Sequence, residues 1–167
     1  MQLFFQIMAE STLHKELVIC MANYVEENYS NTMIVTDLQE KPGDDIPPDI
    51  GGHRPDLYAT TTNSSDLFRT IKSNDLRDKQ KHCIIGEAKT PGDLKTKRSE
   101  KQISSFLGYL NEQKVSSFIL SVPFNTATEA KSKLNLLYKE LNLSLNDCVV
   151  FDQIFAWKLK DSSWHLI

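Results

Sequence analysis

A short apolar segment that ends in two charged residues places the tightest constraint on the fold. Residues 82–89 read His-Cys-Ile-Ile-Gly-Glu-Ala-Lys. Such an apolar run is typical of a buried β-strand. Because side chains alternate across a strand, Glu87 and Lys89 point to one side and Ala88 to the other. The fold must therefore bury this strand and still accommodate two charged groups at its end.

A second segment supplies another carboxylate. Residues 54–60 read Arg-Pro-Asp-Leu-Tyr-Ala-Thr and predict a strand with Asp56 near its start. If this strand pairs with residues 82–89, Asp56 joins Glu87 and Lys89 on one surface. Two carboxylates can hold a hard cation through oxygen ligands, and a lysine can orient or help to deprotonate a water. The pattern therefore favours metal-assisted phosphodiester hydrolysis.

These residues resemble the PD-(D/E)XK nuclease superfamily. Two motifs and three flanking residues carry the resemblance: Pro55-Asp56, Glu87-Ala88-Lys89, Glu16, Asp93 and Gln102. The resemblance implies a restriction-endonuclease-like αβββαβ core of the α/β class, with a mixed β-sheet flanked by helices. It also implies a Mg²⁺ or Mn²⁺ ion held by Asp56, Glu87 and the backbone carbonyl of Ala88, and hydrolysis that leaves a 5′-phosphate.

The ligand residues have structural alternatives. Asp56 would otherwise hold loop amides at the end of a strand, and Glu87 would otherwise form a plain ion pair with Lys89. Asp49 lies in an earlier Pro-Asp pair, but a Gly-Gly turn follows it closely instead of a strand. The superfamily carries this carboxylate on a strand, so the resemblance favours Asp56.

The other site residues also have two interpretations each. Lys89 would act either as a base or as a water-positioning group. Glu16 matches an acidic residue that many members carry on the first helix, or it is a surface glutamate. Gln102 matches a glutamine of several subfamilies, or it belongs to a capping box behind Ser99. Asp93 would orient Lys89 or Arg98, or it is an ordinary loop residue.

The charge distribution favours a nucleic-acid partner. The net charge is −3, yet residues 67–101 hold ten Lys/Arg and five Asp/Glu, which leaves −8 on the rest. A basic stretch around a carboxylate site fits contact with phosphate. Five residues are the candidate DNA contacts: Arg54, Lys95, Lys97, Arg98 and Lys101. Over residues 69–81, a solvated polar loop is the alternative.

The length and composition suit one domain over residues 1–167. Residues 1–10 form an apolar arm, predicted as a strand, a packing segment or a leader, and a candidate homodimer contact. This arm is too short to cross a bilayer and lacks the features of a secretory signal. Three scattered cysteines fit reduced core thiols. We therefore expect a cytoplasmic or nucleoid-associated protein without a membrane partner.

The remaining pattern predicts the order helix, three strands, helix, strand, helix and strands. The first helix runs from Ser11 or Thr12 to about Asn28, and the first strand opens at residues 33–35. Residues 61–81 form a long polar loop. The later elements are a helix after Ser99, a strand over 115–122, a helix after Thr126, and strands over 148–151 and 154–159.

Two further functions remain open at this stage. A non-catalytic protein of the same fold would bind nucleic acid or protein and would need no metal. A generic α/β domain would hold Asp56 and Glu87 far apart. For the nuclease, the absence of an evident recognition domain favours a substrate chosen by DNA structure or by a recruiting protein partner.

Overall fold

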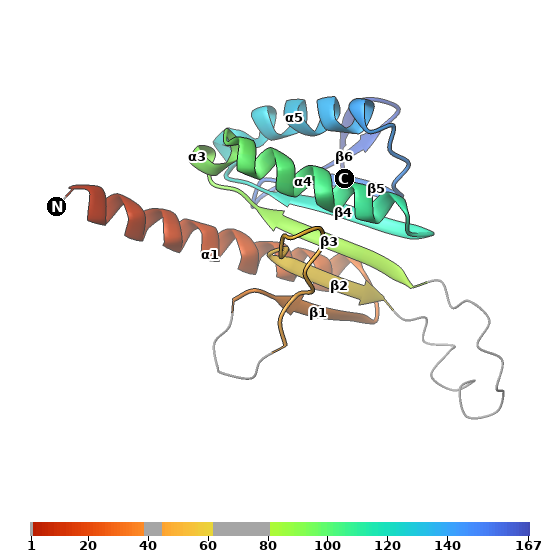
Figure 1. Ribbon diagram of the computed structural model, residues 1–167, viewed down its shortest axis with the longest axis horizontal. Coiled ribbons are helices and arrows are strands. Elements are labelled where there is room, and N and C mark those ends of the chain that lie inside the picture. The colour runs from red at the N-terminus through yellow and green to blue at the C-terminus, as the bar shows by residue number, and fades with distance from the viewer. Residues whose placement is uncertain (1, 39–44, 62–80) are drawn as a thin grey trace.

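A computed structural model of the protein describes residues 2–38, 45–61 and 81–167, with side chains from Thr12 onward. Within these residues the chain is an α/β protein with a seven-stranded mixed sheet (Figure 1). The strands are β1 Thr32–Thr36, β2 Leu57–Thr61, β3 His82–Ala88, β4 Val115–Ser121, β5 Asp147–Phe151, β6 Ala156–Lys160 and β7 Ser163–Leu166. They lie side by side in sequence order.

Strand direction changes across the sheet. The three central strands β3, β4 and β5 are parallel, and every other neighbouring pair is antiparallel. The parallel connections pass through helices, as parallel strands require. The central strands are covered on both faces, which explains why β3 and β4 are buried along almost their whole length.

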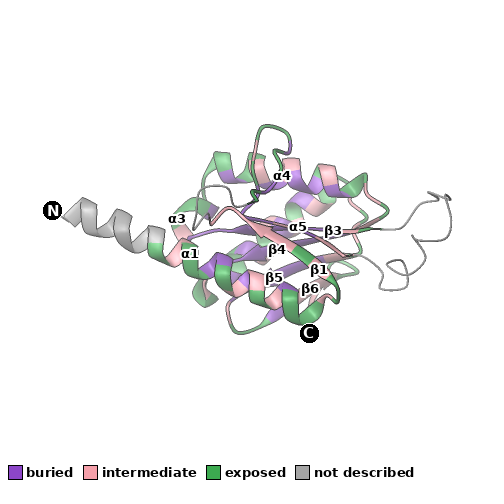
Figure 2. Cartoon of the chain, turned by 90° about the horizontal axis from the view of Figure 1, so that it is seen from below, coloured by how far each residue is buried: buried purple, intermediate pink, exposed green. Residues whose placement is uncertain are grey.

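Helices cover the two faces of the sheet. The helical elements are α1 Gln2–Asn28, α3 Pro91–Leu94, α4 Lys97–Asn111, the 3₁₀ turn η1 Phe124–Thr126 and α5 Ala127–Glu140. Helix α1 lies on one face, and α4 and α5 lie on the other (Figure 1). Figure 2 shows the buried strands between helices whose outer surfaces are exposed. The architecture is therefore three layers.

Strand alternation divides the core between the two faces. Ile84 and Ile119 pack on the α1 side with Met21, whereas Ile85 and Phe118 pack on the α4 and α5 side. Helix α1 approaches β3 closely. A Cβ atom added at Gly86 would lie 2.5 Å from Met21 Sδ. A side chain at this position would therefore displace the buried side chain of Met21 on α1.

The first helix is longer than the sequence pattern predicts. It begins at Gln2, so the expected arm over residues 1–10 is helical from Gln2 onward and is not a strand. Ser11 and Thr12 lie within this helix and do not start it. The reason is that no glycine or proline interrupts residues 1–28. Beyond it, Asn31 adopts a positive φ of 56° before β1.

The cap of α4 also differs from the prediction. The Thr96 hydroxyl accepts a hydrogen bond from the Ser99 N–H at 3.1 Å, so the helix begins at Lys97 and not after Ser99. A one-turn helix, α3, precedes it. The predicted strands are present with small shifts in their bounds, and β7 is an additional strand. Most of the expected loop over 61–81 lies outside the described residues.

Candidate active site

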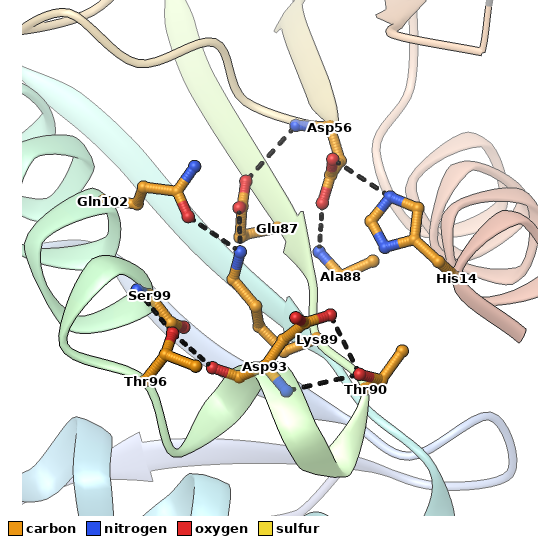
Figure 3. Close-up of polar contacts among 10 residues, drawn as sticks. All are labelled: His14, Asp56, Glu87, Ala88, Lys89, Thr90, Asp93, Thr96, Ser99 and Gln102. Atoms are coloured by element: carbon orange, nitrogen blue, oxygen red, sulfur yellow. Dashed lines mark hydrogen bonds and ion pairs between the residues drawn. The ribbon is translucent and has the colours of Figure 1, made fainter. Parts of the chain in front are cut away.

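The candidate site lies where β2 begins and β3 ends, between α1 and α4 (Figure 3). Leu57 pairs with Gly86 in the antiparallel register, so the next position places Asp56 beside Glu87. Lys89 follows β3 directly. The exposed fractions of Asp56, Glu87 and Lys89 are only 6%, 2% and 7%. Three ionisable side chains are therefore collected in a largely buried position.

The carboxylate of Asp56 is held from two sides. Its Oδ2 accepts a hydrogen bond of 2.7 Å from the backbone N–H of Ala88, and its Oδ1 lies 3.3 Å from His14 Nε2. The N–H and C=O of one strand residue point toward the same edge of the strand. The Ala88 carbonyl therefore faces the edge on which Asp56 lies.

The carboxylate of Glu87 is buried between Asp56 and Lys89. Its Oε2 accepts a hydrogen bond of 3.3 Å from the Asp56 N–H, and its Oε1 lies 2.6 Å from Lys89 Nζ. Burial raises the pKa of Glu87 to about 8, and the neighbouring Asp56 charge adds to this effect, while Lys89 opposes it. Glu87 therefore holds a proton far more readily than an exposed glutamate.

The Lys89 ammonium is fixed by two acceptors. Besides Glu87, its Nζ donates a hydrogen bond of 3.0 Å to Gln102 Oε1, from the first turns of α4 (Figure 3). Gln102 was a candidate for either a site residue or a capping box. Since Thr96 and not Ser99 caps α4, the expected capping box is absent, and the Gln102 side chain is directed to the lysine instead.

The first helix contributes a residue that sequence reasoning missed. His14 lies on the buried face of α1, three residues before Leu17 and four before Val18, both fully buried. Glu16 is exposed and makes no hydrogen bond or ion pair within the described residues. Two residues turn a helix by about 200°. His14 therefore occupies the place expected for Glu16, and its spacing to the buried leucine could have revealed it.

A second missed residue is Asp37, which follows β1. Its N–H donates to the Asp56 carbonyl at 3.0 Å, so the two aspartates are neighbours. Burial, followed by the Asp56 charge, raises the pKa of Asp37 to about 6. The pKa of His14 is also raised, chiefly by its contact with Asp56. No local pattern around Asp37 marks it, because only strand pairing brings it to the site.

The remaining predicted residues lie around the site. Asp93 Oδ2 accepts a hydrogen bond of 2.8 Å from the Thr90 hydroxyl and so stabilises the turn into α3 rather than contacting Lys89. Five basic residues are all exposed: Arg54, Lys95, Lys97, Arg98 and Lys101. Arg98 lies four residues before Gln102 on α4, so the two share one face of the helix.

Comparisons with known proteins identify no relative: no protein-family model, curated protein or solved structure matches this chain. Among the described helices, none combines the length and the apolar character needed to cross a membrane.

Proposed function

We propose that the protein is a metal-dependent nuclease of the PD-(D/E)XK type that hydrolyses phosphodiester bonds in DNA. The observation that carries the proposal is the convergence of Asp56, Glu87 and Lys89 at adjoining strand ends. The element order also supports the restriction-endonuclease-like core: α1, three strands, α4 and β4 follow one another as αβββαβ, with the short α3 before α4.

The residues present suit a divalent cation. Asp37, Asp56 and Glu87 bring three carboxylates together, whereas Lys89 and His14 are the basic side chains that contact them. Two of the carboxylates, Asp56 and Glu87, are buried, and buried carboxylates are costly unless opposite charge accompanies them. A cation held by Asp56, Glu87 and the Ala88 carbonyl would supply that charge through the oxygen ligands that Mg²⁺ and Mn²⁺ accept.

Bound there, the ion would polarise a phosphoryl oxygen and lower the pKa of a water. The chain's own contribution is to position the groups around that water. Lys89 Nζ, fixed by Glu87 and Gln102, can donate a hydrogen bond to the attacking water or to a phosphate oxygen. The Lys89 side chain has little rotational freedom because both of its acceptors, Glu87 and Gln102, lie in ordered elements. Its position is therefore set before substrate binds.

The exposed basic residues would hold the DNA backbone. Arg98 lies on the face of α4 that carries Gln102, and Gln102 contacts Lys89 Nζ, which makes Arg98 a candidate phosphate ligand near the site. Arginine binds phosphate with two parallel hydrogen bonds. Lys97 and Lys101 lie on the same helix, four residues apart, and add positive charge. Such contacts are independent of base sequence, which fits a substrate selected by DNA structure or by a recruiting partner.

The test is a cleavage assay on supercoiled plasmid, linear DNA and branched DNA with Mg²⁺, Mn²⁺ or EDTA. We expect cleavage that requires the metal and is lost in Asp56→Asn and Lys89→Ala. Lys160→Ala, which changes an exposed lysine in β6, is the matched control and should cleave normally. Thermal unfolding of each variant shows whether it is folded. Metal-independent cleavage, or cleavage that survives Lys89→Ala, would contradict the proposal.

A further inference from the structure

Three potential ligands meet on the α1 side of the candidate active site. They are His14 from α1, Asp37 after β1 and Asp56 before β2, and one ligand atom of each lies within 4.8 Å of the others. His14 Nε2 is 3.3 Å from Asp56 Oδ1. Neighbouring ligands of an octahedral ion with bonds of about 2.1 Å are about 3 Å apart. The distances between these three ligand atoms are therefore close to those around one bound cation.

Ordered elements hold these ligands in place. The β1–β2 register ends with Thr36 opposite Leu57, and the next pair is Asp37 and Asp56. The hydrogen bond from the Asp37 N–H to the Asp56 carbonyl extends this pairing. His14 is held by the buried face of α1. Rigid elements position ligands more precisely than loops do.

Asp37 has an oxygen atom that the described structure leaves without a partner. Its Oδ1 is buried and, within the described residues, has no hydrogen-bond partner. An unsatisfied buried acceptor destabilises a fold, and a second carboxylate, Asp56, lies beside it. The ligand set of Asp56, Glu87 and the Ala88 carbonyl does not use Asp37. A separate cation would satisfy this oxygen and offset the like charges.

We propose that His14, Asp37 and Asp56 form a second divalent-cation site that prefers a transition-metal ion such as Mn²⁺ to Mg²⁺. Imidazole nitrogen is a good ligand for transition-metal ions, and Mn²⁺, which is suited mainly to oxygen ligands, still accepts it more readily than Mg²⁺ does. The inference rests on the proposed function through Asp56, which serves both sites. It adds to that function a metal preference that the Asp56–Glu87 carboxylates alone would not give.

The test measures Mn²⁺ binding to the full chain without nucleic acid, by electron paramagnetic resonance. We expect Asp37→Asn and His14→Gln each to weaken the binding of one ion at least tenfold. Pulsed spectra should show nitrogen coupling from a coordinated imidazole that His14→Gln removes. Two matched controls change exposed residues outside the cluster, Asp45→Asn and His165→Gln, and should leave binding and coupling unchanged.

Glu87→Gln separates the two sites, since it should keep the nitrogen-coupled ion. The inference is overturned if bound Mn²⁺ shows no nitrogen coupling, if His14→Gln and Asp37→Asn bind Mn²⁺ normally, or if Glu87→Gln also abolishes the coupled ion. The nuclease proposal is judged separately, by the effect of Lys89→Ala on cleavage. If the protein cleaves DNA but its bound Mn²⁺ shows no coupling to the His14 nitrogen, only the second site is refuted. If the protein does not cleave DNA but binds Mn²⁺ through the His14 imidazole, only the nuclease proposal is refuted.

Discussion

The raised pKa of Glu87 makes the stability of the metal-free protein depend on pH. In the unfolded chain this carboxyl ionises near its ordinary value of 4.5, whereas in the folded protein its pKa is about 8. Between these values the folded state holds a proton that the unfolded state has released. The group therefore stabilises the fold fully below its unfolded pKa, and this contribution is lost as the pH rises toward 8.

The size of the effect follows from the pH interval. Each pH unit between the two pKa values is worth about 1.4 kcal/mol, so raising the pH from about 5.5 to about 8 removes at most about 3 kcal/mol. Because Glu87 is buried beside Asp56 and Lys89 and the three charges depend on one another, we expect about 1–3 kcal/mol. For a chain of this size the melting temperature should then fall by about 3–10 °C.

The assay is thermal unfolding in EDTA across this pH range, with Glu87→Gln and Glu112→Gln alongside. Glu112 is exposed, so its variant should keep the wild-type pH dependence. The Glu87→Gln curve should be flatter. It should keep only the smaller decline from Asp37 and His14, whose raised pKa values act in the same direction. Equal slopes for Glu87→Gln and wild type would refute the reasoning.

Metal provides a second check on the same carboxylate. A cation displaces the proton from Glu87, so Mn²⁺ should raise the melting temperature more at about pH 8 than at about pH 5.5. The difference should shrink in Glu87→Gln. A stabilisation by Mn²⁺ that is the same at both pH values would contradict a site in which metal and proton compete for this group.

Three further perturbations test the packing and the site. Gly86→Ala should destabilise the protein by about 1–3 kcal/mol, because its Cβ meets Met21 Sδ; urea unfolding that is unchanged would contradict this contact. Gln102→Ala should slow cleavage about tenfold to a hundredfold with Mn²⁺ affinity unchanged, because Lys89 loses an acceptor, and unchanged cleavage would exclude that role. Arg98→Gln should raise the KM for DNA with little change in kcat and should weaken the salt dependence of binding. An unchanged KM would show that Arg98 does not contact the DNA.

The fold was predictable where the signal is local. The apolar run of β3 identifies a buried strand, the β-branched and aromatic residues between Val115 and Pro123 identify β4, and the apolar spacing after Thr96 identifies α4. Neither helix start was predicted, because a hydroxyl suited to capping also lies inside each helix. Ser11 and Thr12 lie within α1, and Ser99 lies within α4 and is as good a capping residue as Thr96. Which hydroxyl caps a helix depends on where the preceding chain turns.

In the candidate site, too, the residues fixed by a local pattern were predicted and the others were not. Strand alternation places Glu87 and Lys89 on one side from the sequence alone, and their 2.6 Å contact agrees with it. The resemblance predicts Glu16 because many members of the superfamily carry an acidic residue on the first helix. The structure turns His14 toward Asp56, since the buried stripe of α1 runs through Leu17 and Val18. Helix rotation is set by packing against the sheet.

By itself the sequence determined the strands β1 to β6, the α/β class and the spacing of Glu87 and Lys89, because side-chain periodicity within one element needs no distant partner. Tertiary structure alone decided that Asp37 and His14 join Asp56. The first depends on the register of β1 against β2, and the second on the rotation of α1 over β3. Both are fixed by burial of apolar surface between elements far apart in the chain, which a local pattern does not encode.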